Sequence, residues 1–287
     1  MDTITLWQLA VLAAASMLVG FSKTAVSGAN TISLAVFAAV LPARESTGVL
    51  LPILIAGDIL AVLIYRRHAH WPTLLRLFPA VAVGVLAGTV FMLWADDDAV
   101  ARSIGAILLF MAGVTVWRRR TAARSEEAPE QRDKEQQATD KQATDKQATD
   151  KQATEQRDTE RPDEGKPSLA GRAKARSYGV LGGFTTMVAN AGGPVMSLYL
   201  LSAGFRKLGF LGTSASFFLI VNTSKVPFSV GLGLIDAQSL LLDAVLVLFV
   251  LPGAYLGRAC VGRINQKLFE QIVIGATVLG GLQLLLR

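Results

Sequence analysis

The chain has 287 residues, of which 52% are hydrophobic and only 17% are charged, and its formal net charge is +6. Soluble domains carry about 25% charged residues, and here residues 118–176 hold 15 of the 28 Lys and Arg and 13 of the 22 Asp and Glu. The remaining sequence has too few charges for a hydrated surface, which excludes an ordinary soluble protein. The basic residues lie at the ends of apolar runs and form no polar face, which argues against nucleic-acid binding.

Eight apolar runs follow one another along the chain. They cover residues 6–41, 47–65, 74–94, 101–117, 178–203, 209–234, 240–256 and 268–286. A membrane-spanning helix needs about 20 apolar residues, so most runs fit one span. The first run, with 36 residues, is too long for one span, and run 178–203 is interrupted at Asn190 and Gly192-Gly193-Pro194. The start of the first run lacks the basic residues and the cleavage site of a signal peptide, so residues 6–19 are expected to remain as a membrane helix.

Between the runs lies a polar segment, residues 118–176, in which QATDK occurs three times from residue 137 to 151. It has almost no aromatic or branched apolar residues and cannot bury a core, so a disordered cytoplasmic linker is predicted. The predicted organisation is a first membrane repeat at 1–117, this linker at 118–176 and a second membrane repeat at 177–287.

The two membrane segments resemble each other in order. Gly20-Phe21-Ser22 matches Gly183-Phe184-Thr185 at an offset of 163, and a small-xxx-small pair occurs later in each half, Gly84/Gly88 and Gly253/Gly257. Such pairs let membrane helices pack closely. Asp58 in the first half is predicted to occupy the position that corresponds to Lys225 in the second half, at an offset of 167.

Basic residues set the predicted orientation, because cytoplasmic loops are enriched in Lys and Arg. They place residues 66–76, 118–176, 206–207 and 258–267 inside and Asp96–Asp98 and Asp236 outside. Both termini are then outside, and Arg44, which also falls outside, does not fit the rule. The halves run in opposite directions, so runs 6–41 and 178–203 begin and end on the same side. We therefore expect an all-α polytopic membrane protein with two inverted-topology repeats, each with a broken or re-entrant helix pair followed by three transmembrane helices.

The helix breaks are the predicted binding site. A helix that restarts after a break presents free N–H groups and about half a positive charge, which suits an anion. Asn30 or Thr31 can cap the first restart and Pro194 suits the start of the second. The predicted substrate-binding residues are Lys23, Thr24, Ser27, Asn30, Thr31, Thr186, Asn190, Gly192, Gly193, Ser214, Asn222 and Lys225. The alternative for the small polar residues among them is that they only pack helices.

Three of the predicted site residues are charges inside apolar runs, and such charges are expensive unless they are functional. Lys23 and Lys225 are expected to attract the anion, with Asp58 as counter-ion or proton carrier. The alternative is a structural salt bridge between Asp58 and one lysine.

Other chemistry finds little support in the sequence. His68-Ala69-His70 has no cysteine or nearby acid to complete a metal site, and no P-loop or hydrolase motif occurs. We expect no metal, no cofactor and no enzymatic activity.

At these residues the sequence resembles a known family. Asn190-Ala191-Gly192-Gly193-Pro194 and Gly212-Thr213-Ser214, two inverted halves and a long central linker resemble the TauE/SafE family of sulfite and organosulfonate transporters. The first half departs from the pattern, since Ser27-Gly28-Ala29-Asn30-Thr31 has fewer glycines and no proline. The resemblance implies a substrate such as sulfite, sulfoacetate or a taurine-derived sulfonate.

We therefore expect a secondary transporter of a small sulfur-containing anion in the cytoplasmic (inner) membrane. It would work by alternating access, with the two halves rocking around a midplane site. The alternatives are an anion channel and a non-transporting membrane scaffold. The expected partners are the anionic substrate, the lipid bilayer and, as one alternative, a second copy in a homodimer.

Overall fold

The computed structural model describes residues 4–24, 30–117, 169–205, 207–260, 274–275, 278–279 and 281–286. Within these residues the backbone is almost entirely helical and contains no strand, and five helices are long and apolar enough to cross a membrane. The chain is a multi-pass α-helical membrane protein, which confirms the prediction of an all-α polytopic fold.

The first half contains a broken helix pair and three longer helices. The pair is α1 (Leu6–Thr24) and α2 (Asn30–Val40), followed by α3 (Ala43–Tyr65), α4 (Trp71–Trp94) and a helix over Asp97–Trp117. Helix α2 packs against α1, where the hydroxyl of Ser33 donates to the carbonyl of Ala15 at 2.8 Å. The 36-residue run is thus two helices, as predicted.

The described helices of the second half follow the same order as far as α9. It contains α6 (Leu169–Ala189), α7 (Gly192–Ser202), α8 (Lys207–Gly231) and α9 (Ala237–Cys260). The break between α6 and α7 lies at Asn190, whose φ of 49° is a left-handed conformation that asparagine tolerates. Helix α6 already includes residues 169–176, which were predicted to belong to the linker, because their Ala, Arg and Lys are good helix formers. The rest of that predicted linker, 118–168, lies outside the described residues.

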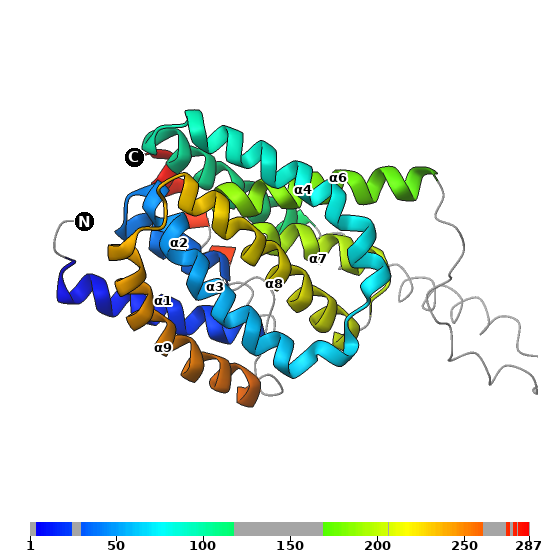
Figure 1. Cartoon of the computed structure of the whole chain (residues 1–287), viewed down its shortest axis with the longest axis horizontal. Coiled ribbons are helices and arrows are strands. Elements are labelled where there is room, and N and C mark those ends of the chain that lie inside the picture. The colour runs from blue at the N-terminus through cyan, green and yellow to red at the C-terminus, as the bar shows by residue number, and fades with distance from the viewer. Residues whose placement is uncertain are drawn as a thin grey trace, which may run out of the picture. The chain divides into compact units, whose positions relative to one another are not determined.

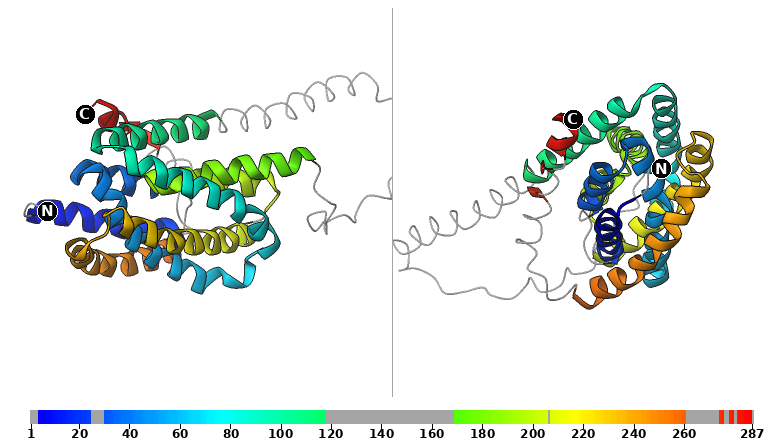
Figure 2. Two further views of the ribbon diagram at one scale, coloured as in Figure 1. Left: turned by 45° about the horizontal axis from the view of Figure 1, so that its top comes forward. Right: turned by 90° about the vertical axis from the view of Figure 1, so that its left-hand side faces the viewer.

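The most extensive helix contacts join the two halves. Helix α1 packs along α9, and α4 packs along α6 (Figures 1 and 2). Glycines permit both contacts because a side chain would collide with the opposite backbone. Four such approaches, each measured from the Cβ that glycine lacks to a backbone oxygen, are Gly253 to Met17 (1.9 Å), Gly84 to Val180 (2.1 Å), Gly20 to Val250 (2.1 Å) and Gly183 to Val81 (2.2 Å). The α1–α9 contact therefore repeats the α4–α6 contact. Equivalent positions of α1 and α6 differ by 163 in residue number, and equivalent positions of α4 and α9 differ by 169.

Helices α3 and α8 pack against each other in opposite directions. A Cβ on Gly48, near the start of α3, would lie 1.9 Å from the carbonyl oxygen of Leu234, just after α8. A Cβ on Gly212, near the start of α8, would lie 2.6 Å from the carbonyl oxygen of Tyr65, at the end of α3. The start of each helix thus meets the end of the other, and their middle residues face each other across the candidate site.

Candidate functional site

Both helix breaks border one cavity. Asn30 begins α2, Gly193 lies in the first turn of α7, and both line the cavity. A helix N-terminus carries unpaired N–H groups and a partial positive charge. Two such ends on one cavity therefore create a positive environment before any side chain is counted.

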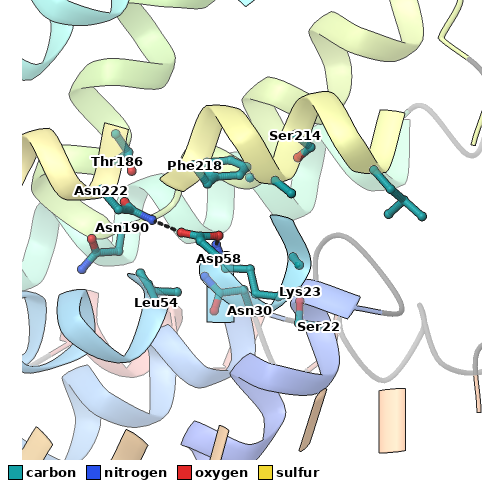
Figure 3. A pocket seen from close by; sticks show the side chains of 14 residues that line it. Ser22, Lys23, Asn30, Leu54, Asp58, Thr186, Asn190, Ser214, Phe218 and Asn222 are labelled. Carbon is teal, nitrogen blue, oxygen red and sulfur yellow. Dashed lines mark hydrogen bonds and ion pairs between the residues drawn. The ribbon is translucent and has the colours of Figure 1, made fainter. Parts of the chain in front are cut away.

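The cavity is small and partly polar, with a volume of about 50 Å³. At roughly 10–15 Å³ per water it holds about three to five water molecules, which is also the scale of a small oxyanion. Figure 3 shows its lining side chains, which come from α1, α2, α3, α6, α7, α8 and the α6–α7 break. The lining residues are Ser22, Lys23, Asn30, Leu54, Asp58, Ala61, Thr186, Asn190, Gly193, Leu211, Ser214, Ala215, Phe218 and Asn222.

A buried ion pair lies on one side of the cavity. Nζ of Lys23 is 2.5 Å from Oδ1 of Asp58, and Nδ2 of Asn222 donates to Oδ2 of Asp58 at 2.7 Å (Figure 3). Asp58 is fully buried, and both of its carboxylate oxygens have a partner. The Lys23 ammonium also lies 4.7 Å from the ring centroid of Phe218, a favourable cation–π distance. The contact joins Asp58 to Lys23 in a salt bridge, a geometry in which both groups are stabilised as ions.

The second buried lysine is bonded differently. Nζ of Lys225 donates to the carbonyl oxygen of Thr186 and to Oδ1 of Asn190, each at 2.6 Å. It also lies 3.4 Å from Oδ1 of Asn222, and the amide of Asn190 donates to the carbonyl of Thr47 at 2.9 Å. Among the described residues, the hydrogen bonds of Lys225 thus all go to neutral oxygens, although its side chain is only 1% exposed.

The two lysines and one aspartate give the site an excess of one positive charge when all three are ionised. A buried ammonium without a carboxylate is costly in an apolar interior. An anion in the adjoining cavity would offset that cost, because Asn190 and Asn222 both bond Lys225 and line the cavity. The electrostatics therefore favour an anionic ligand.

Most of the predicted site residues come together in the structure. Eight line the cavity and Lys225 lies directly behind its wall; the eight are Lys23, Asn30, Asp58, Thr186, Asn190, Gly193, Ser214 and Asn222. Ser27 lies outside the described residues.

Three predicted site residues lie elsewhere. The hydroxyl of Thr24 donates to the carbonyl of Ala254 at 3.0 Å, so it contacts α9 and points away from the cavity. Thr31 is buried in α2 beside Asn30 but is not among the described lining residues. Gly192 is covered by Thr186 and Phe218, which would lie 3.0 Å and 3.3 Å from its Cβ. All three are next to residues that do face the cavity, and sequence proximity does not determine the direction of a side chain.

Several lining residues had no place in the sequence prediction because they are apolar or small. On α8 these are Leu211, Ala215 and Phe218, and they share a helical stripe with Ser214 and Asn222 at spacings of three, four and seven. These three residues could have been predicted from the sequence, because they lie on the same face of the helix as the predicted site residues Ser214 and Asn222. Leu54 and Ala61 follow in the same way from Asp58 on α3, and Ser22 is adjacent to Lys23.

The histidines lie outside this site. His68 is exposed, and Nδ1 of His70 is 2.8 Å from the hydroxyl of Thr73. Within the described part of the chain no group of His, Cys, Asp and Glu side chains could hold a metal ion.

Comparison with known proteins adds one finding. A protein-family model described as Sulfite exporter TauE/SafE matches residues 12–284. No curated protein and no solved structure matches the chain.

Proposed function

We propose a substrate and a mechanism for this chain, which belongs to the Sulfite exporter TauE/SafE family, whose model covers residues 12–284. The chain is a multi-pass membrane transporter. Its proposed substrate is a small sulfur-containing anion, sulfite or an organosulfonate such as sulfoacetate. The proposed direction is export, the activity named in the family description.

One observation carries this proposal: the cavity at the two helix breaks adjoins a buried cluster of two lysines and one aspartate, which has one excess positive charge when all three are ionised. Lys23 is neutralised by Asp58, whereas Lys225 is held by neutral oxygens. A ligand with a single negative charge would neutralise the cluster, while a dianion would leave it negative. We therefore expect hydrogensulfite and sulfonates to bind more tightly than sulfate.

Alternating access is the proposed mechanism. The groups of helices that move as rigid units, however, differ from the two sequence halves. The extensive α1–α9 and α4–α6 contacts join the halves, and backbone-to-glycine approaches of this kind do not slide freely. We propose that each moving body contains helices of both halves, with α1 and α9 in one and α4 and α6 in the other. The cavity would open to one side or the other as α3 and α8 shift.

The proposed location is the cytoplasmic membrane with the central linker inside and both termini outside. The distribution of Lys and Arg supports this orientation, and so does the antiparallel packing of α3 and α8, which occupy corresponding places in the two halves. Reporter fusions at the two termini and within residues 137–151 would test it. A cytoplasmic terminus would contradict it.

The substrate is tested by transport into proteoliposomes. Sulfite, sulfoacetate, taurine, isethionate and methanesulfonate would be compared with sulfate and acetate. We expect saturable transport of at least one sulfonate or of sulfite, with competition by methanesulfonate and little by sulfate. Acetate competing better than every sulfur anion would exclude the proposed substrate, and flux that does not saturate would indicate a channel.

Lys225 is tested by replacement with methionine, an unbranched side chain only one atom shorter than lysine that carries no charge. We expect Lys225→Met to weaken binding of the transported anion at least about tenfold, a change of roughly 1.4 kcal/mol. Arg102→Gln, an exposed position on the helix Asp97–Trp117, is the matched loss of one positive charge outside the cavity. Equal affinity of the Lys225 variant and the control would mean that Lys225 is only structural, as a scaffold requires.

A further inference from the structure

Helix α9 contains a second buried carboxylate, away from the cavity. Asp243 is 3% exposed, and neither of its carboxylate oxygens has a hydrogen-bond partner in the structure. It lies within the apolar segment 240–256, between Leu242 and Ala244. Asp58, the other fully buried carboxylate of the described membrane helices, has a partner for each oxygen.

The position of Asp243 on α9 places it on the side that packs against α1. Asp243, Val250 and Gly257 are seven residues apart and lie on one helical face. The Val250 carbonyl contacts Gly20 of α1, and Gly257 contacts the carbonyl of Phe21. The neighbouring Leu242 and Leu246 belong to the same apolar cluster as Leu12 of α1.

Among the described residues of α1 and α3, which pack against α9, no charged group compensates Asp243. Helix α1 contributes Lys23, whose described ion pair is with Asp58. Helix α3 contributes Arg44, Glu45, Asp58 and Tyr65. Arg44 donates to the carbonyls of Met92 and Ala95, and Tyr65 donates to the carbonyl of Thr24. On α9 itself the other charge is Arg258, about four turns further along the helix.

A buried carboxylate without a partner is far more costly than a buried carboxylic acid. Asp58 avoids this cost by its bonds to Lys23 and Asn222. Asp243 has no such bonds in the described chain, so its surroundings favour the protonated form. The surroundings of the two buried acids therefore favour different protonation states in the same conformation.

Packing does not require an acid at this position. The recurring contacts pair Val81 with Val250 and Gly84 with Gly253, 169 residues apart. The same spacing pairs Asp243 with Leu74 of α4, a fully buried leucine that packs in the corresponding apolar cluster. Where one half uses an apolar side chain, the other contains a group that can bind and release a proton.

We propose that Asp243 is a proton-binding site that couples anion transport to the proton gradient. In the present conformation the carboxyl is protonated, and in a conformation that admits water to the carboxyl its O–H bond breaks and the proton passes to water. The ligand of this site is the proton itself, and the assignment makes Asp243, and not Asp58, the coupling group. This coupling role rests on the proposed transport function.

Infrared spectroscopy of the purified protein in lipid tests the protonation directly. At neutral pH the wild type should show the carbonyl band of a protonated carboxylic acid. The band should be absent from Asp243→Asn and from Asp243→Leu, which introduces the residue of the counterpart position, and present in Asp58→Asn. Absence of the band from the wild type, or its persistence in both Asp243 variants, would overturn the proposal.

Transport tests the coupling. With a pH gradient the wild type should accumulate the transported anion, whereas both Asp243 variants should lose that response and keep exchange of internal for external anion. A variant that still follows the gradient would overturn the coupling role. Failure of the substrate proposal can be distinguished from failure of the coupling proposal. In that case the wild type would exchange no sulfur anion, while the infrared result would be unchanged.

Discussion

Asp58 joins three helices through two oxygen atoms. Oδ1 pairs with Lys23 of α1, and Oδ2 accepts from Asn222 of α8, while Asp58 itself lies on α3. Removing one member of a buried pair leaves the other charge uncompensated, which costs about 3–5 kcal/mol. The pair therefore contributes to stability as well as to the charge of the cavity.

A double-mutant cycle separates these contributions. Asp58→Asn should reduce the free energy of unfolding by about 3–5 kcal/mol, because Lys23 loses its partner. Lys23→Met combined with Asp58→Asn should cost about 0.5–3 kcal/mol less than the sum of the single variants. Denaturant unfolding in detergent measures both, and simple additivity would show that the two charges do not interact.

At the residue scale, the sequence identifies the buried charged residues more reliably than it identifies which positions correspond between the two halves. Lys23, Asp58 and Lys225 are recognisable as charges within apolar runs, and Asp243, which was not among the predicted site residues, meets the same criterion. The assignment of Asp58 to Lys225 at an offset of 167 has no support in the packing. Gly48 and Gly212, at an offset of 164, make equivalent contacts, and that offset pairs Asp58 with Asn222. Only a few residues are shared by the halves, so contacts are needed to fix their register.

Arg44 shows why a single charge is a weak guide to orientation. Its backbone N–H donates to Asp97 at 2.9 Å, and its guanidinium donates to carbonyls at the end of α4, those of Met92 and Ala95. These carbonyls lack partners within the helix. The arginine that did not fit the positive-inside rule thus has a local structural role.

At the scale of helices, the close glycine contacts should be sensitive to one added methyl group. A Cβ on Gly253 would lie 1.9 Å from the Met17 carbonyl oxygen, whereas one on Gly113 meets nothing within 4 Å. Gly253→Ala should therefore lower the free energy of unfolding by about 1–3 kcal/mol. Gly113→Ala should leave it unchanged or raise it by up to about 1 kcal/mol, because alanine favours the helix. Similar unfolding midpoints for the two variants would contradict the packing.

Helix breaks were the elements most readily predicted. Asn190 with the following Gly-Gly-Pro sequence interrupts an apolar run, and the length of run 6–41 requires a second break. Helix ends in polar sequence were less predictable, as the start of α6 shows, because helix formation does not need apolar residues. The pairing of α1 with α9 could not be predicted, because small-xxx-small pairs indicate that a helix packs closely without naming its partner.

On the scale of the whole molecule, the two halves complete each other. Helix α1 of the first half packs on α9, and α6 of the second packs on α4. Neither half alone can cover these faces.

Separating the halves tests this interdependence. A chain divided within residues 137–151 should regain anion transport when both fragments are made in the same cell. Each fragment made alone should be degraded, because its glycine-lined helix faces lack their partners. Stable accumulation of either fragment alone, measured by immunoblot of membranes, would contradict the interlocked arrangement.

The pairing of α1 with α9 also has a consequence for biosynthesis. Roughly 200 residues separate Thr24 from Ala237, and at about 5–20 residues per second their synthesis takes roughly 10–40 s. During that interval α1 is already made while its glycine-lined face has no partner from the same chain. The nascent protein must therefore keep the glycine-lined face of its first helix from other contacts until α9 has been synthesised, and the helix bundle cannot be completed before that point.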